Sequence, residues 1–157
     1  MRPLGLSRGV CGRGRRIAET RGPTPPVICE QLLPVAHAAR HARNVVTDAC
    51  LRWGMPHLVA PAALIISELV SNVVDHAHTL MTIEVVCRPS HLYLAVQDGA
   101  TDPPVRRDLD DTIPPVHGRG LILVETAATA WGYDYQEGGK TVWATVSRDR
   151  ATPGPLP

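Results

Sequence analysis

The sequence predicts an α+β fold: a two-layer sandwich in which a mixed, mainly antiparallel sheet carries helices on one face. Residues 35–54 and about 61–76 repeat apolar side chains at helical spacing. Residues 81–88 and 91–98 instead alternate apolar and polar side chains, and the Pro-Ser pair between them suits a tight hairpin. Because strands joined by a hairpin cannot be parallel, this order of elements excludes a doubly wound parallel sheet.

Turn-forming residues mark where the first elements begin and end. The apolar run between prolines at 25–34, "PPVICEQLLP", is typical of an edge strand. Gly54 lies where a glycine C-cap ends the first helix. Pro61 lies at the expected start of the second helix, because proline is tolerated in a first turn.

The C-terminal part predicts a third helix and a second hairpin. The segment 118–132, "GRGLILVETAATAWG", predicts a helix opened by glycines and stopped by Gly132. "YDYQE" and "KTVWATVS" flank Gly138 and Gly139, which predicts two strands joined by a two-glycine turn. Between the two hairpins, residues 99–117 form a polar, proline-rich connection whose length is typical of a functional lid.

Length and composition predict one domain and exclude several functions. The 157 residues fit a single domain at 26–148, between Gly-, Pro- and Arg-rich tails at 1–25 and 149–157 that predict disorder. A net charge of +1 gives no electrostatic argument for nucleic acid or an anionic membrane. We find no apolar run near the ~20 residues of a membrane span and no signal peptide. We therefore expect a cytoplasmic protein with no membrane and no direct nucleic-acid partner.

Three polar residues, Glu68, Asn72 and His76, lie four apart along one edge of the second helix's apolar arc. At this edge they are neither fully in the core nor fully in water. A carboxylate so placed can hold and activate a hydroxyl or a water. An amide oxygen one turn away can ligate a hard cation such as Mg²⁺. The residues alone leave open the alternative of a packing helix with ordinary polar boundary residues.

Two further stretches place polar groups where a nucleotide could be held. Asp98 shares the parity of its strand's apolar residues, so it points to the core side and needs a donor such as a purine amino group. Alternatively, it caps the turn at Gly99. Gly118 and Gly120 precede an apolar helix whose N-terminus favours an anion, and Arg119 between them could contact phosphate. The alternative there is a flexible junction.

The order of these motifs resembles that of a known family. Glu-x-x-x-Asn on a helix, Asp-Gly after a strand, Gly-x-Gly-Leu at a helix start and Gly-Lys-Thr in a last hairpin resemble the GHKL ATP-binding domain of histidine kinases and gyrase. The segments "SELVSNVVDHA", "GRGLILVETAATAWG" and "GGKTVWATV" are similar to those of its anti-sigma-factor serine kinase branch. The resemblance covers about residues 27–148.

The resemblance implies a Bergerat-type ATP-binding fold with ATP and Mg²⁺ as cofactors. Glu68 matches the general base that activates the attacking hydroxyl, and Asn72 matches the Mg²⁺ ligand. Asp98, followed by Gly99, matches the aspartate that binds the adenine amino group, and Thr141 matches a threonine near the adenine. The glycine-rich segment at the phosphates is matched by Gly118, Arg119, Gly120 and Leu121.

Other positions are less defined or depart from the family pattern. His76 fits a histidine often found after the asparagine, and residues 101–117 match the ATP lid. Lys140 is expected to be solvated rather than to bind the nucleotide. The usual Asp-x-Gly-x-Gly box is "DGATD" here, so its later glycines are missing.

The resemblance implies an anti-sigma factor that is also an ATP-dependent serine/threonine protein kinase. Such a protein binds a sigma factor and phosphorylates a serine of a small anti-sigma antagonist, and it commonly forms a homodimer. The alternative is a nucleotide-sensing, partner-binding module with little or no kinase activity. The missing glycines favour this module, whereas the intact Glu68 and Asn72 pair opposes it. A third possibility is a detached ATPase domain without a protein acceptor.

Overall fold

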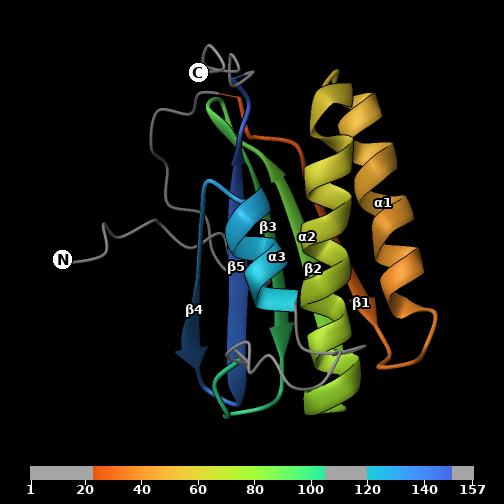
Figure 1. Ribbon diagram of the computed structural model, residues 1–157, viewed down its shortest axis with the longest axis vertical. Helices are drawn as coiled ribbons and strands as arrows, with labels where there is room; N and C mark the ends of the chain where they lie inside the picture. The colour runs from red at the N-terminus through yellow and green to blue at the C-terminus, as the bar shows by residue number, and fades with distance from the viewer. Residues whose placement is uncertain (1–22, 105–119, 150–157) are drawn as a thin grey trace, which may run out of the picture.

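The computed structural model describes residues 23–104 and 120–149. It confirms the predicted α+β class, because one sheet carries the helices against a single face (Figure 1). The strands follow the order β1-β2-β3-β5-β4. Every pairing between them is antiparallel, which agrees with the predicted mainly antiparallel sheet and leaves out its mixed part. The strands are β1 Val27–Leu32, β2 Met81–Cys87, β3 His91–Asp98, β4 Ala130–Gln136 and β5 Gly139–Ser147.

The helices lie where apolar periodicity predicts them, with shifted ends. Gly54 ends the first helical region with a φ of +72°, which confirms it as a C-terminal glycine. The second helix begins earlier than Pro61, and its last turn widens into a π-helical turn. The helical elements are α1 Ala38–Arg52, the 3₁₀ turn η1 Pro56–Leu58, α2 Val59–Asn72, the π-helical turn η2 Val73–Ala77 and α3 Gly120–Ala127.

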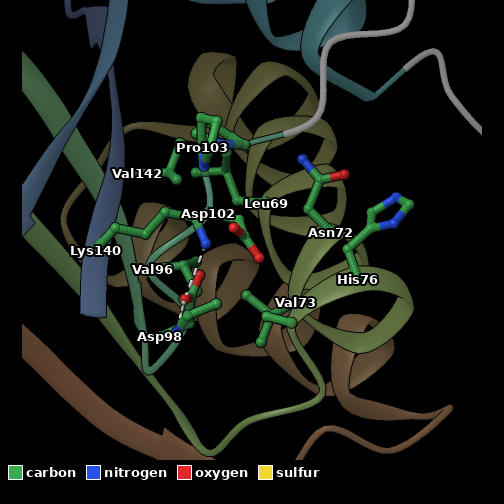
Figure 2. Close-up of a pocket in the computed structure, with 13 residues that line it drawn as sticks. Leu69, Asn72, Val73, His76, Val96, Asp98, Asp102, Pro103, Lys140 and Val142 are labelled. Carbon is green, nitrogen blue, oxygen red and sulfur yellow. Dashed lines mark hydrogen bonds and ion pairs between the residues drawn. The ribbon is translucent and has the colours of Figure 1, made fainter. Parts of the chain in front are cut away.

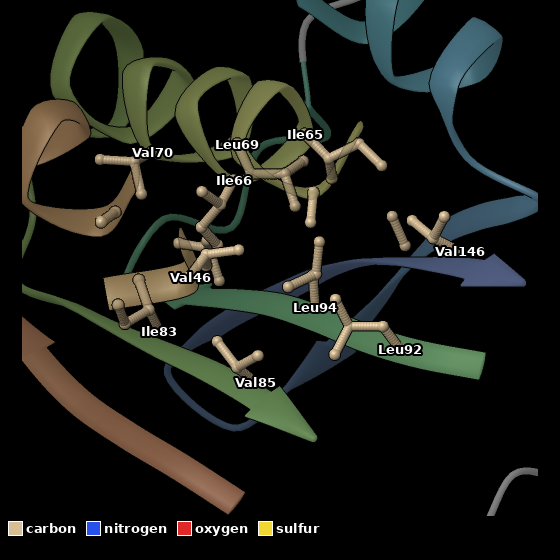
Figure 3. Close-up of a cluster of buried hydrophobic side chains, with 14 of the residues drawn as sticks. Val46, Ile65, Ile66, Leu69, Val70, Ile83, Val85, Leu92, Leu94 and Val146 are labelled. Carbon is tan, nitrogen blue, oxygen red and sulfur yellow. The ribbon is translucent and has the colours of Figure 1, made fainter. Parts of the chain in front are cut away.

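The core is built from aliphatic side chains between α2 and the centre of the sheet. Figure 3 shows Ile66 and Leu69 of α2 facing Leu94 of β3, and all three are buried. Burying one such side chain stabilises the fold by about 1.5–3 kcal/mol. The helix α2 therefore has a fixed position over β3 and β5, which determines where its polar edge lies.

One helical segment is longer than the helix predicted at about residues 61–76. Residues Pro56–Ala77 form 22 continuous helical residues that would suffice, by length and composition alone, to cross a membrane. In this structure α2 packs against α1, α3 and the sheet. A core helix contacted on several sides needs the same apolar composition as a membrane span.

The predicted third helix is wrong at its C-terminal end. The helix stops at Ala127 rather than at Gly132, and β4 begins at Ala130. The backbone N–H of Thr129 donates to the carbonyl oxygen of Thr145 at 2.7 Å, where the pairing with β5 starts. Gly132 lies within β4. A Cβ at this position would lie 2.8 Å from the Trp143 ring, so only glycine fits. Its role is to make room for that ring rather than to cap a helix.

Several sequence expectations fall outside the described residues. The predicted disordered tails at 1–25 and 149–157 lie almost entirely beyond them, and so does the proposed lid from residue 105 onward. Gly118 and Arg119 of the glycine-rich segment lie outside them as well.

Candidate functional site

A cavity of about 430 Å³ lies between the C-terminal part of α2 and the adjoining ends of β3 and β5. Figure 2 shows Lys140 and Asp98 on one side of this cavity and Asn72 and His76 on the other. The lining residues are Leu69, Asn72, Val73, His76, Ala77, Val96, Asp98, Ala100, Asp102, Pro103, Pro104, Lys140 and Val142. The cavity thus combines an aliphatic wall with polar groups at two opposite ends, which is the usual composition of a small-molecule site.

Asp98 forms the polar end contributed by the sheet. It is the last residue of β3 and only 4% exposed, so its predicted direction toward the core side is confirmed. Its Oδ1 atom accepts a hydrogen bond from the backbone N–H of Ala100 at 2.8 Å. The same oxygen accepts from Nζ of Lys140 at 3.0 Å, and both side chains of this ion pair are buried. Such donors offset the free-energy cost of removing a carboxylate from water.

The structure reverses the expected positions of the Lys140 and Thr141 side chains. Lys140 is 5% exposed and lines the cavity, so the expectation of a solvated side chain is wrong. In β5, Lys140 shares a face with Val142, and both line the cavity. Thr141 points to the other face of the sheet, where its hydroxyl accepts from Nε2 of Gln136 at 2.5 Å. The structure therefore does not bring Thr141 to the cavity, and the apolar alternation along β5 was the signal that sequence reasoning missed.

Gly139 has a structural role beyond the two-glycine turn. A Cβ at this position would lie 1.9 Å from the carbonyl oxygen of Asp98. Only glycine therefore lets the start of β5 approach the end of β3 this closely. Gly138 meets the turn requirement by its φ of +79°, and no atom lies within 4 Å of a Cβ there. Gly99 itself donates its N–H to Oγ1 of Thr79 at 2.9 Å and does not line the cavity.

Asn72 forms the opposite polar end, on the last turn of α2. Its Nδ2 atom is buried and has no hydrogen-bond partner within the described part of the chain. His76 follows one turn later in η2, and both side chains line the cavity. The widened turn ends at His78, whose φ of +54° is left-handed. Single π-helical turns are frequent at functional sites. The Nδ2 atom of Asn72, buried beside a cavity without a partner in the described residues, is a donor that a bound ligand can satisfy.

The side chains at this end suit Mg²⁺, which needs few protein ligands, better than a metal ion that the protein must coordinate completely. Among the described residues, no group of three or more His, Cys, Asp or Glu side chains could hold a metal ion. Mg²⁺ takes oxygen ligands, retains several waters and relies on substrate phosphates rather than on a complete protein cage. The amide oxygen and nitrogen of Asn72 are interchangeable in shape, so either atom could face the cavity.

Glu68 lies one turn before Asn72 on α2 but does not itself line the cavity. Burial raises the pKa of its half-buried carboxyl above 4.5, the positive charge of Arg43 opposes this rise, and the negative charge of Asp75 adds to it. Arg43 reaches from α1 and donates to Oγ of Ser67 at 2.8 Å. A carboxylate with a raised pKa holds a proton more readily, which suits a general base.

The glycine-rich segment is described only from Gly120, which begins α3. Leu121 is 3% exposed and does not line the cavity, so it serves packing in this structure. Ala100 and Asp102 occupy the positions where the GHKL family, which the sequence resembles, has glycines. Both side chains line the cavity. Asp102 adds a second carboxylate to the lining, which sequence analysis did not consider as a site residue.

The family model of the histidine kinase-like ATPase domain matches residues 34–146 of this chain. The chain belongs to this family, and ATP binding is the activity that the family supports. A similar solved structure is that of the RsbU and RsbW domains of Rv1364c from Mycobacterium tuberculosis. The two share 21% sequence identity with a TM-score of 0.59, over 80% of this chain and 33% of that one. This chain therefore spans about a third of that structure's chain. No curated protein matches the chain.

Proposed function

We propose that the cavity binds ATP with Mg²⁺, and that the protein is an anti-sigma factor with serine/threonine kinase activity on an anti-sigma antagonist. One observation carries the assignment of the cavity: the buried carboxylate of Asp98 and the amide of Asn72, whose Nδ2 atom has no partner among the described residues, line opposite ends of it. The adenine base needs a fixed hydrogen-bond acceptor at one end of a nucleotide site. The Mg²⁺ ion on the triphosphate needs an oxygen ligand from the protein at the other end.

The aliphatic wall supports placement of the base beside Asp98. Leu69 and Val73 of the α2–η2 segment and Val96 and Val142 of the sheet line the cavity. A purine ring buried between such side chains gains apolar contact, while its amino group donates to the carboxylate of Asp98.

The other end of the cavity supports the transfer step. Asn72 would hold Mg²⁺, which when bound neutralises charge on the phosphates. Glu68, one helical turn away, would accept the proton of the serine hydroxyl of the antagonist. Because Glu68 lies outside the cavity lining, this hydroxyl would approach from the rim of the site.

The choice of partners rests on similarity of fold and on the sequence motifs. The solved structure named above contains an RsbW domain, and its fold is similar to that of this chain. A sigma factor and a small antagonist are accordingly the partners that we propose. A cytoplasmic location stays a prediction from the sequence, and a homodimer stays what the resemblance implies.

A nucleotide-sensing module with little kinase activity is the second candidate. Ala100 and Asp102 replace the expected glycines, and Asp102 brings negative charge to the cavity. A carboxylate near a triphosphate weakens its binding, and a Cβ limits the approach of the backbone.

The decisive test is phosphate transfer from labelled ATP to a serine of an antagonist domain. Glu68→Gln should lower the transfer rate at least about 100-fold, while ATP affinity stays within a few-fold. Glu84→Gln is the matched control, because burial also raises the pKa of Glu84, which lies on β2 away from the cavity. ATP binding without transfer to any antagonist would reject the kinase and leave the sensing module.

The pH dependence of transfer gives a second readout for Glu68. Because burial raises the pKa of this carboxyl above 4.5, it takes up a proton at a higher pH than an ordinary glutamate. The transfer rate should fall as the pH drops through the raised pKa, and Glu68→Gln should lack this acidic limb. The contribution of Glu68 to the free energy of unfolding should instead rise as the pH falls, since a raised pKa favours the protonated folded state; comparison of the wild type with Glu68→Gln measures it.

A further inference from the structure

The two oxygens of the Asp98 carboxylate are used unequally. Oδ1 accepts both the backbone N–H of Ala100 and the ammonium of Lys140. Within the described residues, Oδ2 has no hydrogen-bond partner. The ion pair therefore fixes the carboxylate through one oxygen and leaves the other as an acceptor beside the cavity that Asp98 lines.

The ammonium of Lys140 also keeps bonding capacity. A lysine ammonium has three N–H donors, and in the described part of the chain Asp98 is its one hydrogen-bond partner. Two donors remain on a side chain that is nearly buried and lines the cavity (Figure 2). Since a buried donor without a partner costs free energy, these donors are suited to a ligand.

The ammonium of Lys140 lies 3.0 Å from Oδ1 of Asp98. Because Oδ2 belongs to the same carboxylate, an open acceptor and an open donor adjoin each other in the cavity lining. The edge of adenine presents the complementary pair, a 6-amino donor next to the ring nitrogen N1, which accepts. We propose that Lys140 is a second base-reading residue: its ammonium donates to N1 of adenine, while Oδ2 of Asp98 accepts from the 6-amino group.

This inference rests on the proposed function, because it requires adenine to lie beside Asp98. The alternative is that Lys140 blocks the site, with its ammonium in the place of the adenine amino group. Two features favour base reading. The ammonium bonds Oδ1, which Ala100 already shares, and the cavity beside the pair has a volume of about 430 Å³.

The experiment compares the binding of ATP and of 1-deaza-ATP, in which a C–H group replaces N1, by calorimetry with Mg²⁺ present. The wild-type protein should bind 1-deaza-ATP at least about tenfold more weakly than ATP, because a hydrogen bond from a charged donor is lost. Lys140→Met should bind both nucleotides with equal affinity, because the donor to N1 is lost. Their common affinity should fall below that of the wild type for ATP, since Asp98 also loses its counter-ion. A purely structural role for Lys140 would weaken both nucleotides and preserve their ratio.

The matched control is Thr141→Val, which alters the neighbouring residue on the opposite face and should preserve the tenfold ratio. Equal affinity of the wild type for both nucleotides would overturn the inference, even if Lys140→Met does not fold. Tighter ATP binding by Lys140→Met would show that Lys140 blocks the site, which also overturns it. Failure of the wild type to bind any adenine nucleotide would instead reject the proposed function itself.

Discussion

The two polar ends of the cavity differ in how completely the protein satisfies them. At the sheet end, Asp98 receives two hydrogen bonds and Lys140 is paired with it. At the helix end, the Nδ2 atom of Asn72 is buried with no partner in the described residues. The sheet end is therefore held in place by the protein before a ligand arrives, although in the described part of the chain Oδ2 of Asp98 and two donors of Lys140 stay open. At the helix end the described residues supply no partner for the Nδ2 donor. Sites that leave local bonding incomplete are typical of function rather than of stability.

The backbone around the two ends shows the same contrast. Gly139 lets β5 pack against the carbonyl oxygen of Asp98, so the sheet end is held by paired strands. At the helix end, α2 passes into a π-helical turn that ends in the left-handed residue His78. Variants that remove one group from each end should therefore affect stability and binding in different proportions.

Asp98→Ala should have the largest effect on stability. It leaves the buried ammonium of Lys140 without its counter-ion, and we expect a loss of about 3–5 kcal/mol in the free energy of unfolding. Urea denaturation followed by circular dichroism measures this loss. The double variant Asp98→Ala/Lys140→Met removes both charges and should recover most of it. A loss below about 1 kcal/mol, or no recovery, would show that the sheet end is not held by this ion pair.

Gly139→Ala should have the next largest effect. The new Cβ meets the carbonyl oxygen of Asp98, so β5 must move away from β3, at a cost of about 2–3 kcal/mol. ATP affinity should fall as well, because Asp98 and Lys140 separate. Gly138→Ala is the matched control, since its positive φ costs about 1 kcal/mol without any close contact. Equal losses for the two variants in thermal or urea unfolding would remove the close approach as the reason for glycine.

Asn72→Ala should have the smallest effect on stability and the opposite sign. It removes a buried unpartnered polar atom from a helix and introduces a better helix former, so we expect a gain of about 1 kcal/mol. The dependence of ATP affinity on Mg²⁺ should be lost in calorimetric titrations with and without the metal. A clear destabilisation, or an unchanged Mg²⁺ dependence, would mean that Asn72 belongs to the packing of α2.

Local patterns predicted much of the fold and part of the site. Strand alternation and helical spacing depend on residues a few positions apart, so they gave the elements and the inward direction of Asp98. The local pattern misplaces the end of α3, because Gly132 resembles a helix stop while the residue that requires glycine there, Trp143, lies on another strand. Cross-strand packing of this kind has no local signature.

The sequence by itself determined that one helix carries Glu68 and Asn72 a turn apart and that a strand ends in an inward Asp98. The alternation along β5 already separates the face of Lys140 from that of Thr141, but only the tertiary structure decided that Lys140 lies beside Asp98 in the cavity. The two members of that ion pair are 42 residues apart in the chain. Their meeting depends on the antiparallel register of β3 and β5, which places them directly opposite each other. Register is a property of the assembled sheet, and one residue's shift would have exchanged the two faces of β5.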